Sequence, residues 1–430
     1  MKRRLLAGVL TFVMMLSLLP TVALAQNDED PTASTNITMQ YDDYVSAETY
    51  GTVTAITNED VLEITADGGL HAKGVGNATF TADGTEYSVT VEKAKLNIVL
   101  VAGQSNANGV HGILDVPAIT PAKGNSYWWD GGLTDLSKKV ADQEANASGT
   151  SVGWYPALAA EWYALTGEKT VIIHKCVSGN PISTWASYDG HSVTRITTGT
   201  ADAVEGCIDA IQANGNYTIA HAGYYWLQGE TDAYLTNKEE ITDYTTAQKY
   251  ETAYLAMHEA FTDALNKAGV GSYGAILSCR TRNNIGSYQA IEYCGMRVAQ
   301  QDLANQHSDI YMATVLTDDW HEAGDVSFTA KSNEFGTLTY TTTKMGANNI
   351  HYNQSGYNVL GLDAADNMYA ALFDKPSITG IELIGHIGYT KYQDGATIKV
   401  EENMRIIGEN NVEEDTGMAQ IVARTLPISA

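Results

Sequence analysis

Short apolar segments alternate with helical segments over most of this chain, and that alternation limits the possible folds more than any other feature. The apolar segments have the length of strands and lie at 96–101, 170–173, 222–226, 273–277 and 310–315. Helical patterns occupy 155–165, 202–213, 247–268, 288–304 and 356–372. Repeated strand–helix units predict an α/β domain with a mostly parallel sheet. We place this domain at 95–374.

The first 25 residues have the layout of a secretory signal. A basic start at 2–4 is followed by an apolar run at 5–19 and by an Ala-x-Ala site that ends at Ala25. This order predicts cleavage after Ala25 and a secreted, extracellular protein. The apolar run is short for a membrane anchor, so we expect no membrane span after cleavage. A polar linker at 26–35 follows.

Residues 36–94 contain short strands with period-two alternation, separated by Gly-containing turns. That pattern predicts a small β-sandwich. Residues 67–78 read Asp-Gly-Gly-Leu-His-Ala-Lys-Gly-Val-Gly-Asn-Ala and resemble the bacterial immunoglobulin-like group 2 repeats. The resemblance implies an Ig-like module that attaches the protein to a cell surface or a glycan. At the other end, 375–430 is acidic and strand-like, which predicts a β-rich appendage whose role the sequence does not indicate.

Charge and cysteine content exclude several functions. The chain has 25 Lys and Arg against 51 Asp and Glu, a net charge of −26, which opposes binding to nucleic acid. Its four cysteines are Cys176, Cys207, Cys279 and Cys294. They fit one or two disulfides, with three possible pairings, or equally well buried free thiols. Because no Cys-x-x-Cys pair and no His-Glu-x-x-His motif is present, we assign no metal and no cofactor.

Polar segments follow the predicted strands, at the sheet edge where ligands of an open α/β fold bind. Ser105 lies on a Gly-flanked turn after the first strand, and Gly179 follows the second. Gln228-Gly229-Glu230 follows the third strand, and His351 precedes the last helix. Together these residues supply a hydroxyl, backbone N–H groups, an amide and an imidazole, which are the groups that acyl transfer requires.

A second serine competes with Ser105. Residues 149–153 match the Gly-x-Ser-x-Gly pattern of a nucleophile elbow. That motif needs a strand directly before it, and 142–148 is polar without a strand pattern. We interpret the match as a loop.

Four blocks resemble the SGNH hydrolases, and in particular the sialate O-acetylesterase-like and family 6 carbohydrate esterases. The blocks are Gly-Gln-Ser-Asn at 103–106, Gly179 with Trp185, Gln-Gly-Glu at 228–230, and His351, in the family's order. The resemblance implies a three-layer αβα, flavodoxin-like domain. It also implies Ser105 as the nucleophile, His351 as the general base, and an oxyanion hole of the Ser105 and Gly179 N–H groups with the Gln228 side chain. The substrate contacts that we expect are Gln104, Asn106 and Trp185.

One position departs from the family pattern. The acid that stands three residues before the histidine is replaced by Asn348. There are three explanations: Glu230 serves as the acid, the enzyme works as a Ser–His dyad, or the domain is weakened and kept for binding. We favour the first two, because the nucleophile and oxyanion blocks are intact. Glu230 also has a second interpretation, as a carboxylate that supports the turn around Ser105, and we place this support role slightly ahead.

The sequence therefore predicts an exported serine esterase that removes O-acetyl groups from acetylated glycans, such as sialic acid or plant polysaccharides, through an acyl-enzyme. The alternative is a non-catalytic carbohydrate-binding or adhesion protein with a decayed esterase domain. The acylated sugar, the disulfide pairing and the oligomeric state do not follow from the sequence.

Overall fold

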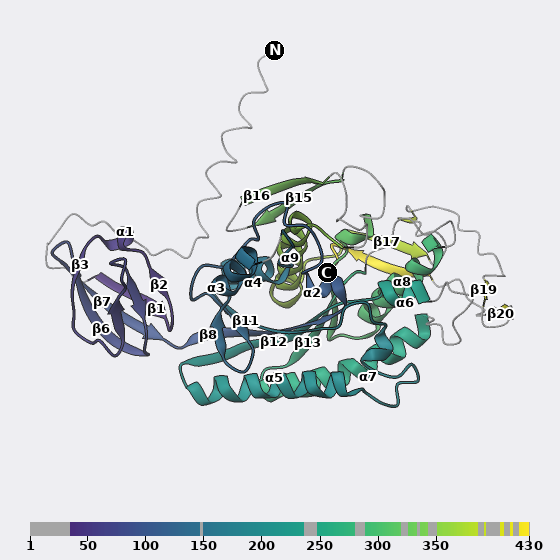
Figure 1. Cartoon of the computed structure of the whole chain (residues 1–430), viewed down its shortest axis with the longest axis horizontal. Coiled ribbons are helices and arrows are strands. Elements are labelled where there is room, and N and C mark those ends of the chain that lie inside the picture. Colours follow the sequence, from purple (N-terminus) through teal and green to yellow (C-terminus); the bar gives the residue numbers. More distant parts are fainter. Residues whose placement is uncertain are drawn as a thin grey trace, which may run out of the picture. The chain divides into compact units, whose positions relative to one another are not determined.

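A computed structural model describes residues 35–146, 149–235, 247–279, 289–319, 326–332, 336–342, 351–385, 391–392, 405–407, 413–415 and 421–429. The chain divides into two compact units between Glu92 and Lys93 (Figure 1). The predicted signal at 1–25, nearly all of the linker at 26–35, and Asn348 lie outside the described residues.

The first unit is a small two-sheet β structure. One sheet has the order β1-β7-β6-β3, formed by Thr35–Gln40, Thr85–Glu92, Gly76–Ala82 and Val53–Ile56. The other has the order β2-β5-β4, formed by Tyr44–Val45, Leu70–Ala72 and Leu62–Ile64. A single turn of helix, α1 (Ala47–Tyr50), interrupts the strands. Alternate residues such as Val89 and Val91 on β7 are buried with Leu62 and Phe80, which gives this unit its own core.

The second unit is built on a seven-stranded sheet with the order β10-β9-β11-β8-β12-β13-β14. In that order the strands are Leu133–Asp135, Ser126–Trp129, Lys169–Cys176, Ala94–Gly103, Tyr217–Leu227, Ser272–Leu277 and Ile310–Thr314. Neighbouring strands are parallel except β10, which pairs antiparallel with β9. The predicted mostly parallel α/β sheet is confirmed.

Helices cover both faces of this sheet, as the two buried clusters show. On β8, Leu96, Ile98 and Leu100 point into one cluster, whereas Val99 and Val101 point into the other. The first cluster is covered by α5 (Arg195–Asn214), α7 (Ala247–Leu265) and α8 (Gln289–Gln306). The second is covered by α3 (Leu136–Asn146), α4 (Tyr155–Thr166) and α9 (Gln354–Tyr369), on the opposite side of the sheet in Figure 1. The unit therefore has three layers.

Further strands follow the central sheet. β15 (Val326–Ser332) and β16 (Gly336–Thr342) form an antiparallel hairpin. β17 (Gly380–Gly385) pairs with β18 (Lys391–Tyr392) and with β21 (Ile421–Leu426), and β19 (Arg405–Ile407) pairs with β20 (Glu413–Asp415). On β21, the buried Arg424 Nε donates to Gln301 Oε1 of α8 at 2.8 Å. Within the segment predicted as an appendage, β17 and β21 thus pack against α8 of the second unit.

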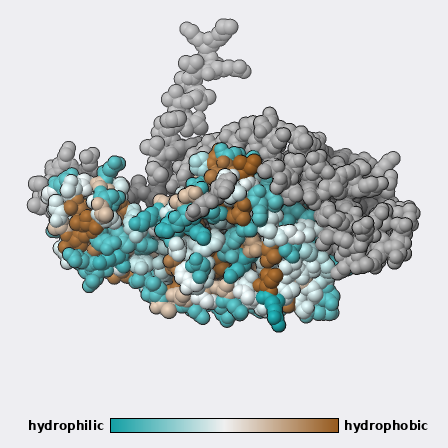
Figure 2. Space-filling view, in the orientation of Figure 1, coloured by the Kyte–Doolittle hydropathy of each residue, from teal (hydrophilic) through white to brown (hydrophobic). Residues whose placement is uncertain are grey.

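Cys176, Cys207 and Cys279 are free thiols, so no disulfide joins any two of these three cysteines. Burial raises the pKa of Cys176 and Cys207, which makes both thiols poor nucleophiles. Among the described residues, no helix is long and apolar enough to cross a bilayer. The face drawn in Figure 2 is mostly hydrophilic or neutral, with separate hydrophobic areas.

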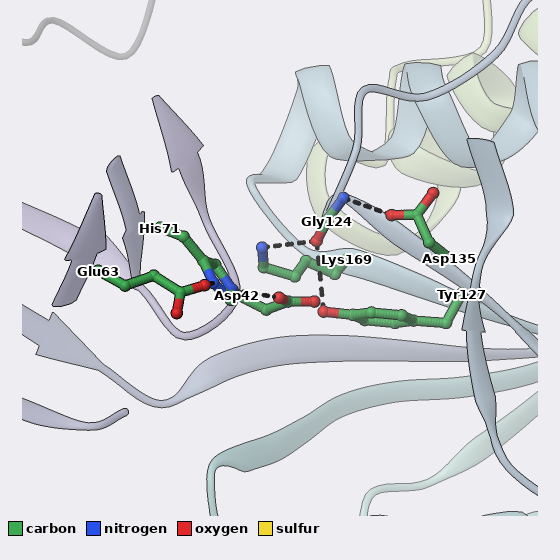
Figure 3. Close-up of polar contacts among 7 residues, drawn as sticks. All are labelled: Asp42, Glu63, His71, Gly124, Tyr127, Asp135 and Lys169. Carbon is green, nitrogen blue, oxygen red and sulfur yellow. Dashed lines mark hydrogen bonds and ion pairs between the residues drawn. The ribbon is translucent and has the colours of Figure 1, made fainter. Parts of the chain in front are cut away.

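Two polar groups are drawn in Figure 3, one from each unit. In the first unit, His71 Nε2 lies 2.7 Å from Asp42 Oδ1 and His71 Nδ1 lies 2.7 Å from Glu63 Oε1. Burial alone would lower the pKa of His71, but the hydrogen bonds to both carboxylates raise it. In the second unit, the buried Lys169 Nζ donates to the carbonyl oxygen of Gly124 at 2.7 Å, where β11 begins beside β9.

Candidate active site

The predicted site residues meet at a topological switch point. β8 lies between β11 and β12 in the sheet. After β8, the chain first forms β9, β10 and β11 on one side of it, and then crosses to the other side to form β12, β13 and β14. In open α/β sheets, ligands bind beyond the carboxyl ends of the strands at such a point. Ser105, Gly179 and Gln228 follow the ends of β8, β11 and β12 respectively, so the fold brings all three to the same edge of the sheet.

A glycine allows the sharp turn that presents Ser105. Gly103 has φ of +133°, and a Cβ atom there would lie 2.2 Å from the carbonyl oxygen of Leu227. A side chain at this position would therefore separate β8 from β12. After Gly103, the Gln104 N–H donates to the same carbonyl at 3.1 Å, and Ser105 begins the short helix α2 (Ser105–Asn108). The backbone of Ser105 is thus fixed by its own strand and by the neighbouring strand.

Glu230 is tied to the residue next to Ser105. Asn106 Nδ2 donates to Glu230 Oε1 at 2.8 Å, and both side chains are buried. Tyr357 of α9 donates from its hydroxyl to Asn106 Oδ1 at 3.3 Å. Gln104 Oε1 accepts from the backbone N–H of Thr231 at 3.2 Å. Gln104 and Asn106, which the sequence suggests as substrate contacts, hold α2 in place against α6 (Glu230–Leu235) and α9.

The side-chain amide of Gln228, expected as an oxyanion donor, is hydrogen-bonded within the protein. Its Nε2 donates to Asp232 Oδ2 and to the carbonyl oxygen of Asn180, at 3.2 Å in the latter case. Because both neighbours are acceptors, the reversed amide would place Oε1 against two oxygens, so the orientation is well determined. The two N–H groups of Gln228 are therefore already used, and the side chain holds the turn that contains Gly179 and Asn180.

Asp232 is a buried carboxylate that the sequence reasoning missed. Besides Gln228, it accepts from the backbone N–H of Ile182 at 2.9 Å and from the hydroxyl of Tyr188 at 3.4 Å. It lies four residues after Gln228, in the first turn of α6. The only signal in the sequence is this spacing after the Gln-Gly-Glu block. Asp232 and Gln228 together fix the loop after β11, which contains Gly179. Gly179 has φ of +73°, and no atom lies within 4 Å of the position that a Cβ would take there.

His351 is placed by the beginning of α9. Gln354, the first residue of α9, is buried, and its Oε1 accepts from Val152 N at 2.7 Å. The next residue, Ser355, donates to Asp115 from its backbone N–H at 2.9 Å and from its hydroxyl at 2.6 Å. These contacts bind the start of the helix to the loops at 109–115 and 151–153, and so determine where the residues before the helix lie.

A second histidine lies beside His351. The ring centroids of His111 and His351 are 5.0 Å apart, with an interplanar angle of 36°. His111 Nε2 is 3.0 Å from Ser178 Oγ, and Asn108 Nδ2 donates to the same hydroxyl at 3.3 Å. Hydrogen bonds therefore link α2 and His111 to the turn after β11, and a ring contact links His111 to His351. His111 and Ser178 stand in no recognised block, so the sequence offered no signal for them.

His174 supports α2 from the neighbouring strand β11. The pKa of His174 is lowered to about 4, mainly because the ring is buried. Hydrogen bonds to the backbone of Asn108 and Ala107 raise the pKa and offset only part of this effect. The ring lies 5.2 Å from Trp128 and 5.3 Å from Tyr155, measured between centroids. A neutral imidazole at the end of α2 thus holds the helix that begins with Ser105.

Ser151 and Trp185 both have structural roles. Ser151 is buried in a loop, where its hydroxyl donates to the Gly109 carbonyl at 2.6 Å and accepts from Gly112 N at 2.9 Å. The interpretation of 149–153 as a loop is confirmed. Trp185 is fully buried, with its ring edge-on to Trp226 at 5.3 Å and to Phe261 at 6.0 Å. In this structure it packs in the core beneath the site, which corrects its assignment as a substrate contact.

The described residues contain no group of three or more His, Cys, Asp or Glu that could hold a metal ion. What they place together is a serine on a constrained turn, a loop with an open glycine, buried carboxylates and two histidines. This set of groups is suited to proton transfer and nucleophilic attack.

No family model matches the chain, and no curated protein matches it. Among solved structures, a protein from Arabidopsis thaliana matches with a TM-score of 0.42 and 14% identity, over 63% of this chain and 96% of that one. A carbohydrate acetylesterase from Xanthomonas citri matches with a TM-score of 0.39 and 15% identity, over 82% and 78%. A protein from Bacillus subtilis matches with a TM-score of 0.32 and 11% identity, over 72% and 67%.

Proposed function

We propose that this protein is a serine esterase that removes O-acetyl groups from glycans, with Ser105 as its nucleophile. The observation that carries the proposal is the placement of Ser105. It stands directly after β8 at the switch point, on a turn that only glycine at 103 permits, and the Asn106–Glu230 pair holds the next residue. A serine held in this way at the edge where ligands bind supports a nucleophilic role, provided that a general base lies beside it.

In the proposed reaction, His351 accepts the proton of the Ser105 hydroxyl while Oγ attacks the acetyl carbonyl carbon. The negative charge on the carbonyl oxygen is stabilised by the N–H groups of Ser105 and Gly179. Collapse of the tetrahedral intermediate transfers the proton from His351 to the sugar oxygen, and the acetyl group stays on Ser105. Water then attacks the acyl-enzyme, again with His351 as the base, and acetate leaves. Gln228 and Asp232 act by positioning Gly179.

For Glu230 we propose the support role. Its Oε1 accepts from Asn106, on the helix that Ser105 begins. Asn348 then leaves a Ser–His dyad, in which an amide orients the ring without stabilising the imidazolium as a carboxylate would.

The substrate class and the location rest on sequence. Four blocks in family order support an acetylated carbohydrate as the substrate, and residues 1–25 support export with cleavage after Ala25. We further propose that the first unit is the Ig-like module and serves attachment. The runner-up, a non-catalytic carbohydrate-binding protein, is favoured only by the Asn348 substitution.

The test compares the wild type with Ser105→Ala and Ser151→Ala for release of 4-nitrophenol from its acetate ester. Ser151→Ala is the matched control, because it removes a hydroxyl in a nearby loop that the proposal gives no chemical role. We expect loss of nearly all activity in Ser105→Ala and an acetyl adduct on Ser105 after rapid acid quench. Equal rates in the wild type and Ser105→Ala would support the non-catalytic alternative.

A further inference from the structure

A cavity opens at the opposite end of the sheet from Ser105. Its volume is about 400 Å³, and it is lined by residues near the beginnings of β12, β13 and β14, among them His221, Ser272 and Asp309. His221 and Gln228 lie on the same strand and the turn after it, seven residues apart, which corresponds to roughly 20 Å at the rise of a β-strand. This cavity is therefore separate from the candidate active site. Its volume lies at the lower end of the range for ligand pockets.

The walls of the cavity carry oriented polar groups. His221 Nδ1 is 2.9 Å from Glu168 Oε2, which fixes the orientation of the ring at the cavity wall. Asp309 is half-exposed, and its Oδ2 lies 3.1 Å from His258 Nε2, which fixes the position of its carboxylate. Ser272 and Ser308 complete the polar lining, and the Ser272 hydroxyl donates to the carbonyl oxygen of Thr262 at 3.4 Å. The wall thus offers both donors and acceptors at fixed positions.

Aromatic surface adjoins these polar groups. Tyr311 lines the cavity and is partly exposed, with its ring edge-on to the buried Tyr273 at 6.4 Å. Next to the lining residue Leu372, Phe373 is 46% exposed, although its ring is held 5.0 Å from His221 and 5.0 Å from Tyr369. The Phe373 ring is thus held in place with much of its surface open, which suits it to stacking against the flat apolar face of a ligand.

We propose that this cavity is a second binding site, for one or two neutral sugar units. A sugar ring presents an apolar face to an aromatic ring and hydroxyls, which are both donors and acceptors, to the polar wall. An anionic ligand is disfavoured by Asp309 and by the net charge of −26. A second site of this kind would hold a polysaccharide on the enzyme while other units reach Ser105. Binding at this second site is separate from the proposed esterase function and does not require ester hydrolysis at Ser105.

The test fills the cavity without disturbing the fold. Gly271 lines it, is exposed, has no left-handed φ, and has no atom within 4 Å of an added Cβ, so Gly271→Phe places a ring at the cavity. The matched control is Gly199→Phe on α5, where an added Cβ is equally unhindered. Titration calorimetry would measure binding of unacetylated xylohexaose, unacetylated galactohexaose and, as an anionic probe, N-acetylneuraminic acid. Hydrolysis of 4-nitrophenyl acetate would be measured separately.

We expect at least one neutral probe to bind, and its Kd to rise about tenfold or more in Gly271→Phe with no change in Gly199→Phe. Ester hydrolysis is expected to stay within about twofold of wild type in both variants. Phe373→Ser should weaken the same binding. An unchanged Kd in Gly271→Phe, no saturable binding of either neutral probe, or binding of the anionic probe alone would overturn the inference. If the wild type shows no esterase activity, the proposed function is overturned, whereas the binding result still supports the second site.

Discussion

Asp366 provides a quantitative test of the packing between α9 and α4. Burial, together with the charges of Glu161 and Asp363, raises the pKa of this carboxyl to about 7, and burial is the largest of these causes. The unfolded chain has an ordinary Asp pKa near 4. Between about pH 4 and pH 7 the folded protein therefore binds more protons than the unfolded chain, and the free energy of unfolding falls as the pH rises. Above pH 7 Asp366 is charged in the folded protein as well, and its full destabilising effect on the folded state is present.

The size of this penalty follows from the shift. About three pKa units correspond to about 4 kcal/mol at 1.36 kcal/mol per unit. Because Asp366 is only partly buried, solvent screens part of the interaction, and we take about half of that value, roughly 2 kcal/mol. Asp366→Asn should then raise the free energy of unfolding by about 2 kcal/mol at pH 8 and leave it nearly unchanged at pH 4.

Urea unfolding monitored by tryptophan fluorescence suits this measurement. All 7 tryptophans of the chain lie after Glu92, so the signal reports the second unit alone. Asp374→Asn is the matched control, because Asp374 is exposed beyond the same helix. The slope of the free energy against urea should stay constant among the variants. An equal gain at pH 4 and pH 8, or a loss at pH 8, would refute the reasoning.

Three further changes test the site and the first unit. Trp185→Ala should lower the free energy of unfolding by about 4 kcal/mol, seen in urea, and leave the ester rate per folded molecule unchanged; the reverse pattern would restore its role as a substrate contact. Asp232→Ala should reduce kcat for 4-nitrophenyl acetate about tenfold through a looser Gly179 turn, with Tyr188→Phe as the milder control. Because the folded pKa of His71 is raised, its contribution is present below about pH 6.5 and lost at higher pH, so His71→Gln should increase hydrogen exchange in 35–92 at pH 5 more than at pH 9.

The strand and helix pattern was sufficient to predict the central architecture. The helical pattern at 155–165 corresponds to α4 (Tyr155–Thr166), and the apolar segment at 273–277 corresponds to β13 (Ser272–Leu277). β9 (Ser126–Trp129) was not predicted, because three consecutive aromatic residues in so short a segment do not distinguish a strand from a loop. It becomes a strand through pairing with β11, and a contact of this kind cannot be read from a short segment alone.

Within the site, the sequence predicted where residues lie along the sheet better than where their side chains point. Ser105, Gly179 and Gln228 follow three strand ends, and parallel strands bring such ends together. The direction of Gln228 depends on Asp232 and on the Asn180 carbonyl, which reach it only after the loop following β11 has folded. Trp185 is similar, because its burial depends on Phe261 from a helix far along the chain.

In the proposed mechanism, Asn348 at the position of the usual acid and the occupied amide of Gln228 affect the same step. If the backbone N–H groups of Ser105 and Gly179 are the donors, stabilisation of the oxyanion depends on how firmly the Gly179 turn is held. An imidazolium that no carboxylate stabilises raises the barrier of that step further. Asn348→Asp should therefore increase kcat markedly, by about tenfold or more, while KM stays nearly constant. Asn349→Asp is the control that adds the same charge one residue away. No gain in Asn348→Asp, together with loss of activity but not of folding in Glu230→Gln, would show that Glu230 is the acid and that its contact with Asn106 is secondary.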